Sequence, residues 1–407
     1  MSALAFLLLL ANPEEEFTAL VERIRQAGEP TRLEELATPP IPDEENSAAG
    51  LRDADAWRRA HGDVVGVLDR AVFSAGGALA AEERAAIQSA LAATEPYVAL
   101  LKSAASRPRW HVARDWSQGF AAASGSIPWI TDAALHLEAR IRFDPAAGEG
   151  EERASECVAL LLGLQERVRE PYYVGHVVSE GFLLRGVQLL QLALRREGCD
   201  AGKLRGRLDA KLARAVASTG PPKRTFFEER AATLKVLADW LEGKRTVAFA
   251  DGEELIPRGV PRDEIVADGV RYLRFMARAI EECEVSAEAA VQAADRLASD
   301  PLPTAPFLHG SALLAKNVFR SYVARSAAVR LARVALALME HRAAKGAWPA
   351  SLDAIADRFE GGMPLDPYTG QPFAYKAEGG GARVWALHRD PRKADSEEEL
   401  LAWRWDG

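Results

Sequence analysis

Residues 174–194 constrain the fold more than any other stretch, because they are apolar on almost every side of a helix. A helix of this kind has to be buried by neighbouring helices on most of its faces. A second apolar stripe, formed by Cys157, Leu161, Leu164 and Val168, precedes it at helical spacing. We therefore expect these two segments to form the centre of a multi-helix array, with Cys157 as a buried thiol.

Helical spacing of apolar residues continues on both sides of this centre. Proline-rich segments at 38–45, 219–222 and 300–303 separate the predicted helices. Pro96 interrupts one stripe and predicts a kink or a helix end there. The further stripes begin at Phe17, Ile87, Phe227, Val266 and Val323.

The pattern changes after residue 305. A long helix is predicted to end near Gly346, since glycine is a common residue just past a helix end. Residues 371–376 and 382–387 then alternate like two strands joined by a glycine-rich hairpin, and 401–405 predict a third strand.

The predicted fold class is therefore mainly α, with three parts. Residues 12–304 form a multi-helix bundle or array, and residues 305–407 form a module of one long helix and a small antiparallel β-meander. Residues 1–11 read as the remnant of a signal or anchor segment. This apolar run is too short to span a membrane but fits the apolar part of a signal peptide. Its alternative interpretation is the buried first turn of a helix.

The C-terminal part resembles the major pseudopilin of type II secretion, over about 80 residues. That family has the end of a long helix, a short connection and a small β-meander in this order. The residues that carry the resemblance are Gly346-Ala347-Trp348-Pro349, Leu352, Asp366-Pro367-Tyr368, Gly370-Gln371-Pro372-Phe373 and Tyr375. The resemblance implies a pseudopilin-like α+β module here.

Two features depart from the pseudopilin pattern. The prepilin-peptidase signal is absent, and the segment 388–395, in the place of the family's calcium loop, has bases such as Arg392 and Lys393 where acids would be needed. The whole chain is also similar to a group of uncharacterised bacterial proteins of planctomycete type, through Gly28-Glu29-Pro30 and the stretch 39–46. These resemblances imply an architecture and an exported or envelope location, with the cytoplasm as the alternative, and they imply no chemistry.

Charge and motifs exclude several functions. Lys plus Arg is 51 and Asp plus Glu is 59, so the net charge of −8 disfavours nucleic acid as a partner. The sequence has no phosphate loop, dinucleotide fingerprint, nucleophile elbow or HExxH motif. We accordingly expect no cofactor and name no catalytic residue, and we expect membrane association only through the N-terminus.

Two pairs are candidate metal ligands, because side chains four residues apart share a helix face. They are His176 with Glu180, in the most apolar segment, and His111 with Asp115, between two tryptophans. The alternatives are a hydrogen-bonded core pair and structural packing. His136 and Glu138, two apart, are expected on different helix faces.

Aromatic residues gather in the predicted C-terminal module. Large side chains are needed to give so small a sheet a core, and any that stay exposed form a candidate docking surface for a protein partner. The candidates are Trp348, Tyr368, Phe373, Tyr375 and Trp385.

The sequence thus supports a non-enzymatic, envelope-associated helical interaction or scaffold protein. The alternative is a metal-dependent hydrolase with its site between helices, and a pilus-like subunit is a third hypothesis. Whether the chain is an enzyme stays open, with the balance toward no.

Overall fold

The structure is a computed structural model that describes residues 12–73, 79–123, 127–144, 150–168, 172–195, 200–216, 221, 223–244, 255–256, 259–387 and 401–405. The predicted signal segment at 1–11 and the positions of the pseudopilin calcium loop at 388–395 lie outside these residues.

The chain is mainly helical, with a small antiparallel sheet after a long helix, which confirms the predicted fold class. The helices are α2 (Pro13–Gln26), α3 (Ser47–Ala60), α4 (Gly62–Phe73), α5 (Ala81–Ala93), α6 (Glu95–Ser106), α7 (Ile127–Phe143), α8 (Gly150–Arg167), α9 (Tyr172–Leu194), α10 (Ala201–Val216), α11 (Lys223–Leu241), α12 (Arg262–Glu281), α13 (Ala287–Ser299) and α14 (Pro306–Lys345). The strands are β1 (Ala374–Glu378), β2 (Gly381–Trp385) and β3 (Ala402–Trp405).

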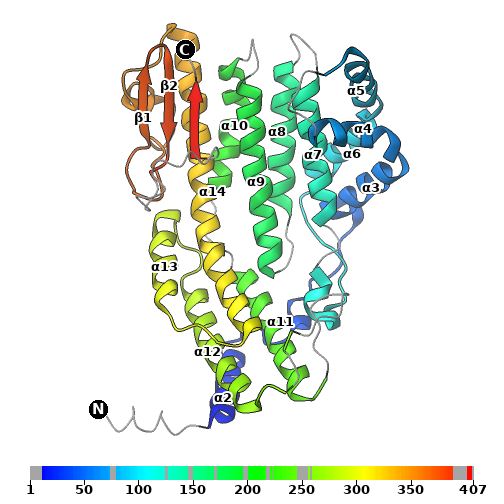
Figure 1. The fold of residues 1–407 in the computed structure, drawn as a ribbon, viewed down its shortest axis with the longest axis vertical. Coiled ribbons are helices and arrows are strands. Elements are labelled where there is room, and N and C mark those ends of the chain that lie inside the picture. The colour runs from blue at the N-terminus through cyan, green and yellow to red at the C-terminus, as the bar shows by residue number, and fades with distance from the viewer. Residues whose placement is uncertain are drawn as a thin grey trace.

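The molecule is elongated, and α14 runs along much of its length (Figure 1). At one end α7, α8, α9 and α10 stand side by side with the C-terminal half of α14, flanked by the sheet on one side and α3 to α6 on the other. At the opposite end α2, α11, α12 and α13 surround the beginning of α14.

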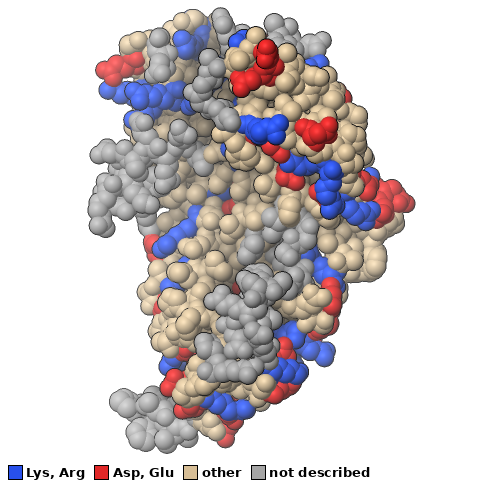
Figure 2. Space-filling model, turned by 45° about the vertical axis from the view of Figure 1, so that its right-hand side comes forward, with Lys and Arg blue, Asp and Glu red and all other residues tan. Residues whose placement is uncertain are grey.

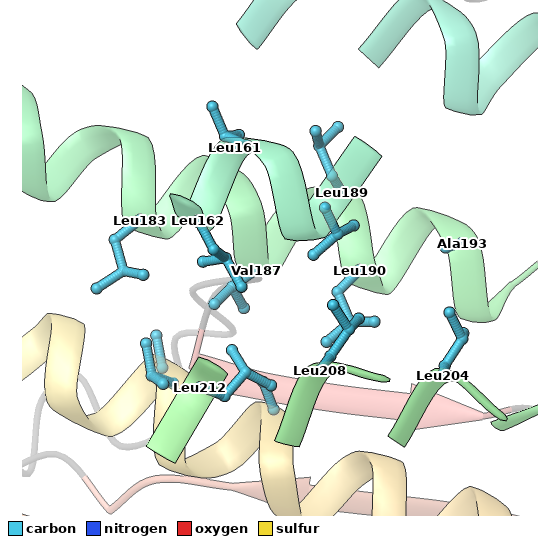
Figure 3. Close-up of a cluster of buried hydrophobic side chains, with 14 of the residues drawn as sticks. Leu161, Leu162, Leu183, Val187, Leu189, Leu190, Ala193, Leu204, Leu208 and Leu212 are labelled. Atoms are coloured by element: carbon cyan, nitrogen blue, oxygen red, sulfur yellow. The ribbon is translucent and has the colours of Figure 1, made fainter. Parts of the chain in front are cut away.

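The predicted central helix, α9, is confirmed, and it lies in the larger of two main hydrophobic cores. Leucines of α8, α9 and α10 interlock there, among them Leu161, Leu190 and Leu208, each buried completely (Figure 3). This core explains why α9 carries apolar residues on nearly all sides. Residues 175–194 are also long and apolar enough to cross a membrane, but half of that segment is buried inside the protein.

A second core fills the other end and is richer in aromatic side chains. Tyr173 and Phe226 pack edge to face, with ring centroids 5.3 Å apart, and Phe226 contacts Phe319 of α14. The amphipathic helix α2 lays its apolar side on this core.

Helix α14 belongs to both cores. Its residues from Leu308 to Val323 lie in the second core, and those from Ala327 to Leu338 lie in the first. Gly346 ends the helix with φ of 72°, a left-handed conformation that glycine adopts without strain, as predicted. The boundary expected near residue 305 falls between α13 and α14 in sequence, yet both hydrophobic cores extend across it.

The sheet has the order β1-β2-β3 with antiparallel neighbours. Gly379 and Gly380, both with positive φ, make the turn between β1 and β2, so the predicted hairpin and third strand are confirmed. The strand expected from residue 371 begins at Ala374 instead. Pro372 has no N–H to donate to a strand ladder and forms only an isolated bridge.

Candidate functional site

Charged side chains are buried where the two main cores meet, along the first turns of α9. We call this cluster the polar junction and define it as His176, Glu180, Glu228, Glu229 and Arg325. It joins three elements, namely α9, α11 and α14. Charges withdrawn from water in this way have to find partners or give up their charge.

The predicted pair His176 and Glu180 is brought together in the junction, with His176 Nε2 3.2 Å from Glu180 Oε1. Arg325 of α14 lies on the same carboxylate, 2.9 Å from Oε1, and its guanidinium also covers the Tyr322 ring. The side chains of Glu180 and Arg325 are 4% and 8% exposed, so this ion pair is essentially dry.

The place beside Glu180 where a metal would bind is therefore taken by a cation of the chain itself. A metal site needs several converging ligands, and the part of the chain that the structure describes contains no group of three or more His, Cys, Asp and Glu side chains arranged to hold one. The geometry of this pair supports a buried ion pair that ties α9 to α14.

Glu228 and Glu229 form the other half of the junction. The Glu228 carboxylate accepts the backbone N–H of Tyr172 at 3.2 Å, and Glu229 accepts that of Tyr173 at 3.4 Å. These are the first two residues of α9, whose N-terminus carries a partial positive charge. Two acids of α11 thus cap a different helix, and Tyr172 starts that helix with φ of 64°.

Burial changes the protonation of these two acids. It raises the pKa of Glu229 to about 8, against the opposing effect of the hydrogen bonds from Tyr173 and Ser311. Burial also raises the pKa of Glu228, and Arg224 opposes this by donating to its carboxylate at 2.8 Å. Glu229 consequently remains protonated at neutral pH.

The second predicted pair does not share a helix face, because residues 107–115 are not helical. The His111 ring contacts the Thr38 hydroxyl at 3.2 Å, whereas Asp115 is exposed and caps the turn that follows. Hydrogen bonds from Ser117 and Gln118 lower the pKa of Asp115. The spacing rule used for this pair was wrong here, since it holds only within a helix.

The five aromatic candidates of the tail hold the module together. Phe373 is buried, and the other four are half-buried. The Trp348 indole N–H donates to the carbonyl of Gly380 at 2.9 Å, and the Tyr375 hydroxyl donates to Pro349 at 2.9 Å. Tyr368 packs against both main cores, and Trp385 lies under the Arg383 guanidinium. None of the five is fully exposed, so docking through them stays a prediction.

An ion-pair cluster around Arg58 was not singled out from the sequence. Arg58 pairs with Asp69 at 2.7 Å and with Asp132 at 3.0 Å, which links α3, α4 and α7. Glu138 pairs with Arg142 and Arg185, away from His136, as expected from their spacing. The sequence did not identify the partners of Arg58, because its two acids lie on other helices.

A groove of about 510 Å³ opens at the α2 end, between α12 and the beginning of α14. Its wall is mainly apolar and includes Val260, Ile265 and Phe307. Asp268 at its edge is occupied structurally, because its carboxylate accepts the N–H of Thr304 at 2.9 Å and the Thr304 hydroxyl at 2.8 Å.

The face of the molecule in Figure 2 carries intermixed acidic and basic side chains. It shows no broad region of positive charge of the kind a nucleic-acid duplex needs. No protein-family model, curated protein or solved structure matches this chain.

Proposed function

We propose that this chain is a non-enzymatic scaffold at the cell envelope, which holds its C-terminal module in a fixed position for a protein partner. The observation that carries the proposal is the continuity of α14. Its 40 residues pass through both main cores without a break and end at the sheet.

The attachment of the sheet supports a fixed display. Val384 and Trp403 of the sheet belong to the same core as the helices, and Asp366 accepts the N–H of Leu387 at 2.7 Å. Arg330 of α14 donates to the carbonyl of Leu365 at 3.0 Å. A module held by packing and hydrogen bonds on several sides presents its outer face in one orientation, which lowers the entropic cost of binding.

The alternative, a metal-dependent hydrolase, has weaker support. It relied on two candidate pairs of metal ligands. In the first pair, Arg325 forms an ion pair with Glu180. In the second, His111 contacts Thr38 in a loop, whereas Asp115 is exposed and caps a turn. The envelope location is proposed from the sequence of residues 1–11 and from the family resemblances.

Lysine crosslinking of the full-length chain in its native cells tests the scaffold proposal. Lys345 and Lys376 belong to the module end, whereas Lys102 and the 61% exposed Lys244 belong to the helical body. We expect crosslinks to one recurring envelope partner at Lys345 and Lys376 and none at the body lysines.

Three results would contradict the proposal. They are recovery of the chain without a recurring partner, crosslinks spread evenly over body and module, and stoichiometric metal in the purified protein together with hydrolytic activity. Lys376→Arg serves as the matched control, because it keeps the charge and removes only the crosslinkable amine.

A further inference from the structure

The apolar groove between α12 and the beginning of α14 lies beside the start of α2. Pro13, the first residue of α2, is part of its lining. Other apolar side chains of the lining include Leu255, Val260 and Phe307, which are only half-buried. The groove volume of about 510 Å³ is in the range of sites that hold small molecules, so the groove can take several side chains of a peptide.

The start of α2 is held at the edge of this groove. The Asn12 side chain accepts the N–H of Glu14 at 3.1 Å and so caps the helix. Glu14 in turn pairs with Arg262, the first residue of α12, at 2.6 Å. Farther along, Phe17 packs so closely on Gly269 of α12 that a Cβ there would lie 3.1 Å from its ring. The preceding chain therefore enters α2 at the edge of the groove.

The residues before Asn12 form an uncharged apolar run. Residues 3–11 contain five leucines, one phenylalanine and three alanines. An extended chain spans at most about 3.6 Å per residue, so Leu10 is at most about 11 Å from Pro13. A segment held this close has an effective concentration in the millimolar range. The run is near enough to fill the groove, and covering the groove would remove apolar surface of both from water.

The charge around the groove argues against an anionic amphiphile as its occupant. Asp263 and Glu264 are exposed at the rim. Asp268 is already paired with Arg271. The two exposed acids repel a fatty acid or a lipid with an anionic head, whereas residues 3–11 bring no charge into the groove.

We propose that the groove holds residues 4–10 of the same chain. Their apolar side chains pack against the wall formed by Val260 and Phe307, which joins the start of α2 to both α12 and α14. The inference goes beyond the proposed function and does not rest on it, because a scaffold can hold this run in its own groove at any location. The envelope location is then supported by the family resemblances alone.

The test is photocrosslinking within the full-length chain. Phe6 is replaced by the photoreactive analogue benzoylphenylalanine, and the crosslinked peptides are mapped by mass spectrometry. We expect crosslinks within one copy of the chain, mainly to the peptides that carry Val260, Ile265 and Phe307. The control is the same probe at Phe73, which is 75% exposed and ends α4 at the opposite end of the molecule (Figure 1). It should give no crosslinks to these peptides.

The variant Val260→Asp tests whether the groove wall holds the run. Val260 is half-buried just before α12, so the change puts a charge in the wall without emptying the buried core. We expect the yield of groove crosslinks to fall roughly tenfold, because an apolar segment that covers the charge removes its hydration. Leu387→Asp is the matched control, since it places the same charge at a 40% exposed leucine of the C-terminal module.

A second variant keeps the test decisive if Val260→Asp fails to fold. Leu9→Asp changes the run itself and alters none of the residues assigned to the two main cores. It should lower the yield of groove crosslinks by a similar factor.

The proposal is overturned by an absence of groove crosslinks, by crosslinks that join two copies, or by an unchanged yield in Val260→Asp and Leu9→Asp. It is also overturned if the chain isolated from its own cells lacks residues 1–11, or if the probe at Phe6 attaches to lipid in the membranes of those cells. These last two results leave the scaffold standing and support its envelope location. Groove crosslinks in a chain without a recurring partner would instead reject only the scaffold.

Discussion

The polar junction and the C-terminal module are both held together by polar contacts, but their surroundings differ. In the junction the groups are shielded from water, with Glu180 against Arg325 and with Glu228 and Glu229 at the N-terminus of α9. In the module, half-buried aromatic side chains donate to backbone carbonyls, as Trp348 does to Gly380. Breaking a buried ion pair costs more stability than losing one neutral hydrogen bond. The predictions below test this contrast.

The largest effect is expected from breaking the junction. Arg325→Leu leaves Glu180 buried beside His176 without its base, so we expect the free energy of unfolding to fall by about 3–5 kcal/mol. The double variant Glu180→Leu/Arg325→Leu removes both charges and should recover most of that loss. Urea denaturation of both variants measures the difference, and a double variant as unstable as the single one would contradict the assignment.

The next effect concerns Glu229 and depends on pH. In the folded protein its pKa is about 8, above the ordinary 4.5, so the folded state binds the proton more tightly than the unfolded chain. Its stabilising contribution is complete below about pH 4.5 and is lost as the pH rises through about 8. Thermal unfolding should show stability declining across this window.

Glu229→Gln should flatten that decline and raise stability at pH 8 by up to a few kcal/mol, because the amide never ionises. Glu242→Gln is the control, since Glu242 is 61% exposed. A Gln variant with the same pH slope as the unmodified protein would show that Glu229 is not responsible.

The smallest effect is expected at Trp348, a half-buried residue that joins the end of α14 to the sheet. Trp348→Phe removes the hydrogen bond to Gly380 and should cost about 1 kcal/mol in chemical denaturation. Crosslinking at Lys345 and Lys376 should be unchanged. A loss of crosslinks without a loss of stability would instead make Trp348 part of a docking surface.

The sequence predicted the elements whose signals are local. The apolar run of α9, the stop of α14 at Gly346 and the glycine turn between β1 and β2 each depend on residues close together in the chain. Pro96 likewise separates two helices, as predicted, because proline fits the first turn of α6.

Reasoning from local sequence could predict only part of the polar junction. Spacing along one helix placed His176 beside Glu180. The base that pairs with Glu180, Arg325, lies on another helix 145 positions later in the chain. No periodicity encodes such a contact. Glu228 and Glu229 belong to α11 but cap α9, because tertiary packing sets which helix end they reach.

The unbroken course of α14 has a mechanical consequence. At 1.5 Å per residue its 40 residues form a strut of about 60 Å. We expect a pull or twist at the sheet to be transmitted along α14 to the groove beside α12, because α14 is helical over all 40 residues. Loading one end of the molecule should therefore be felt at the other.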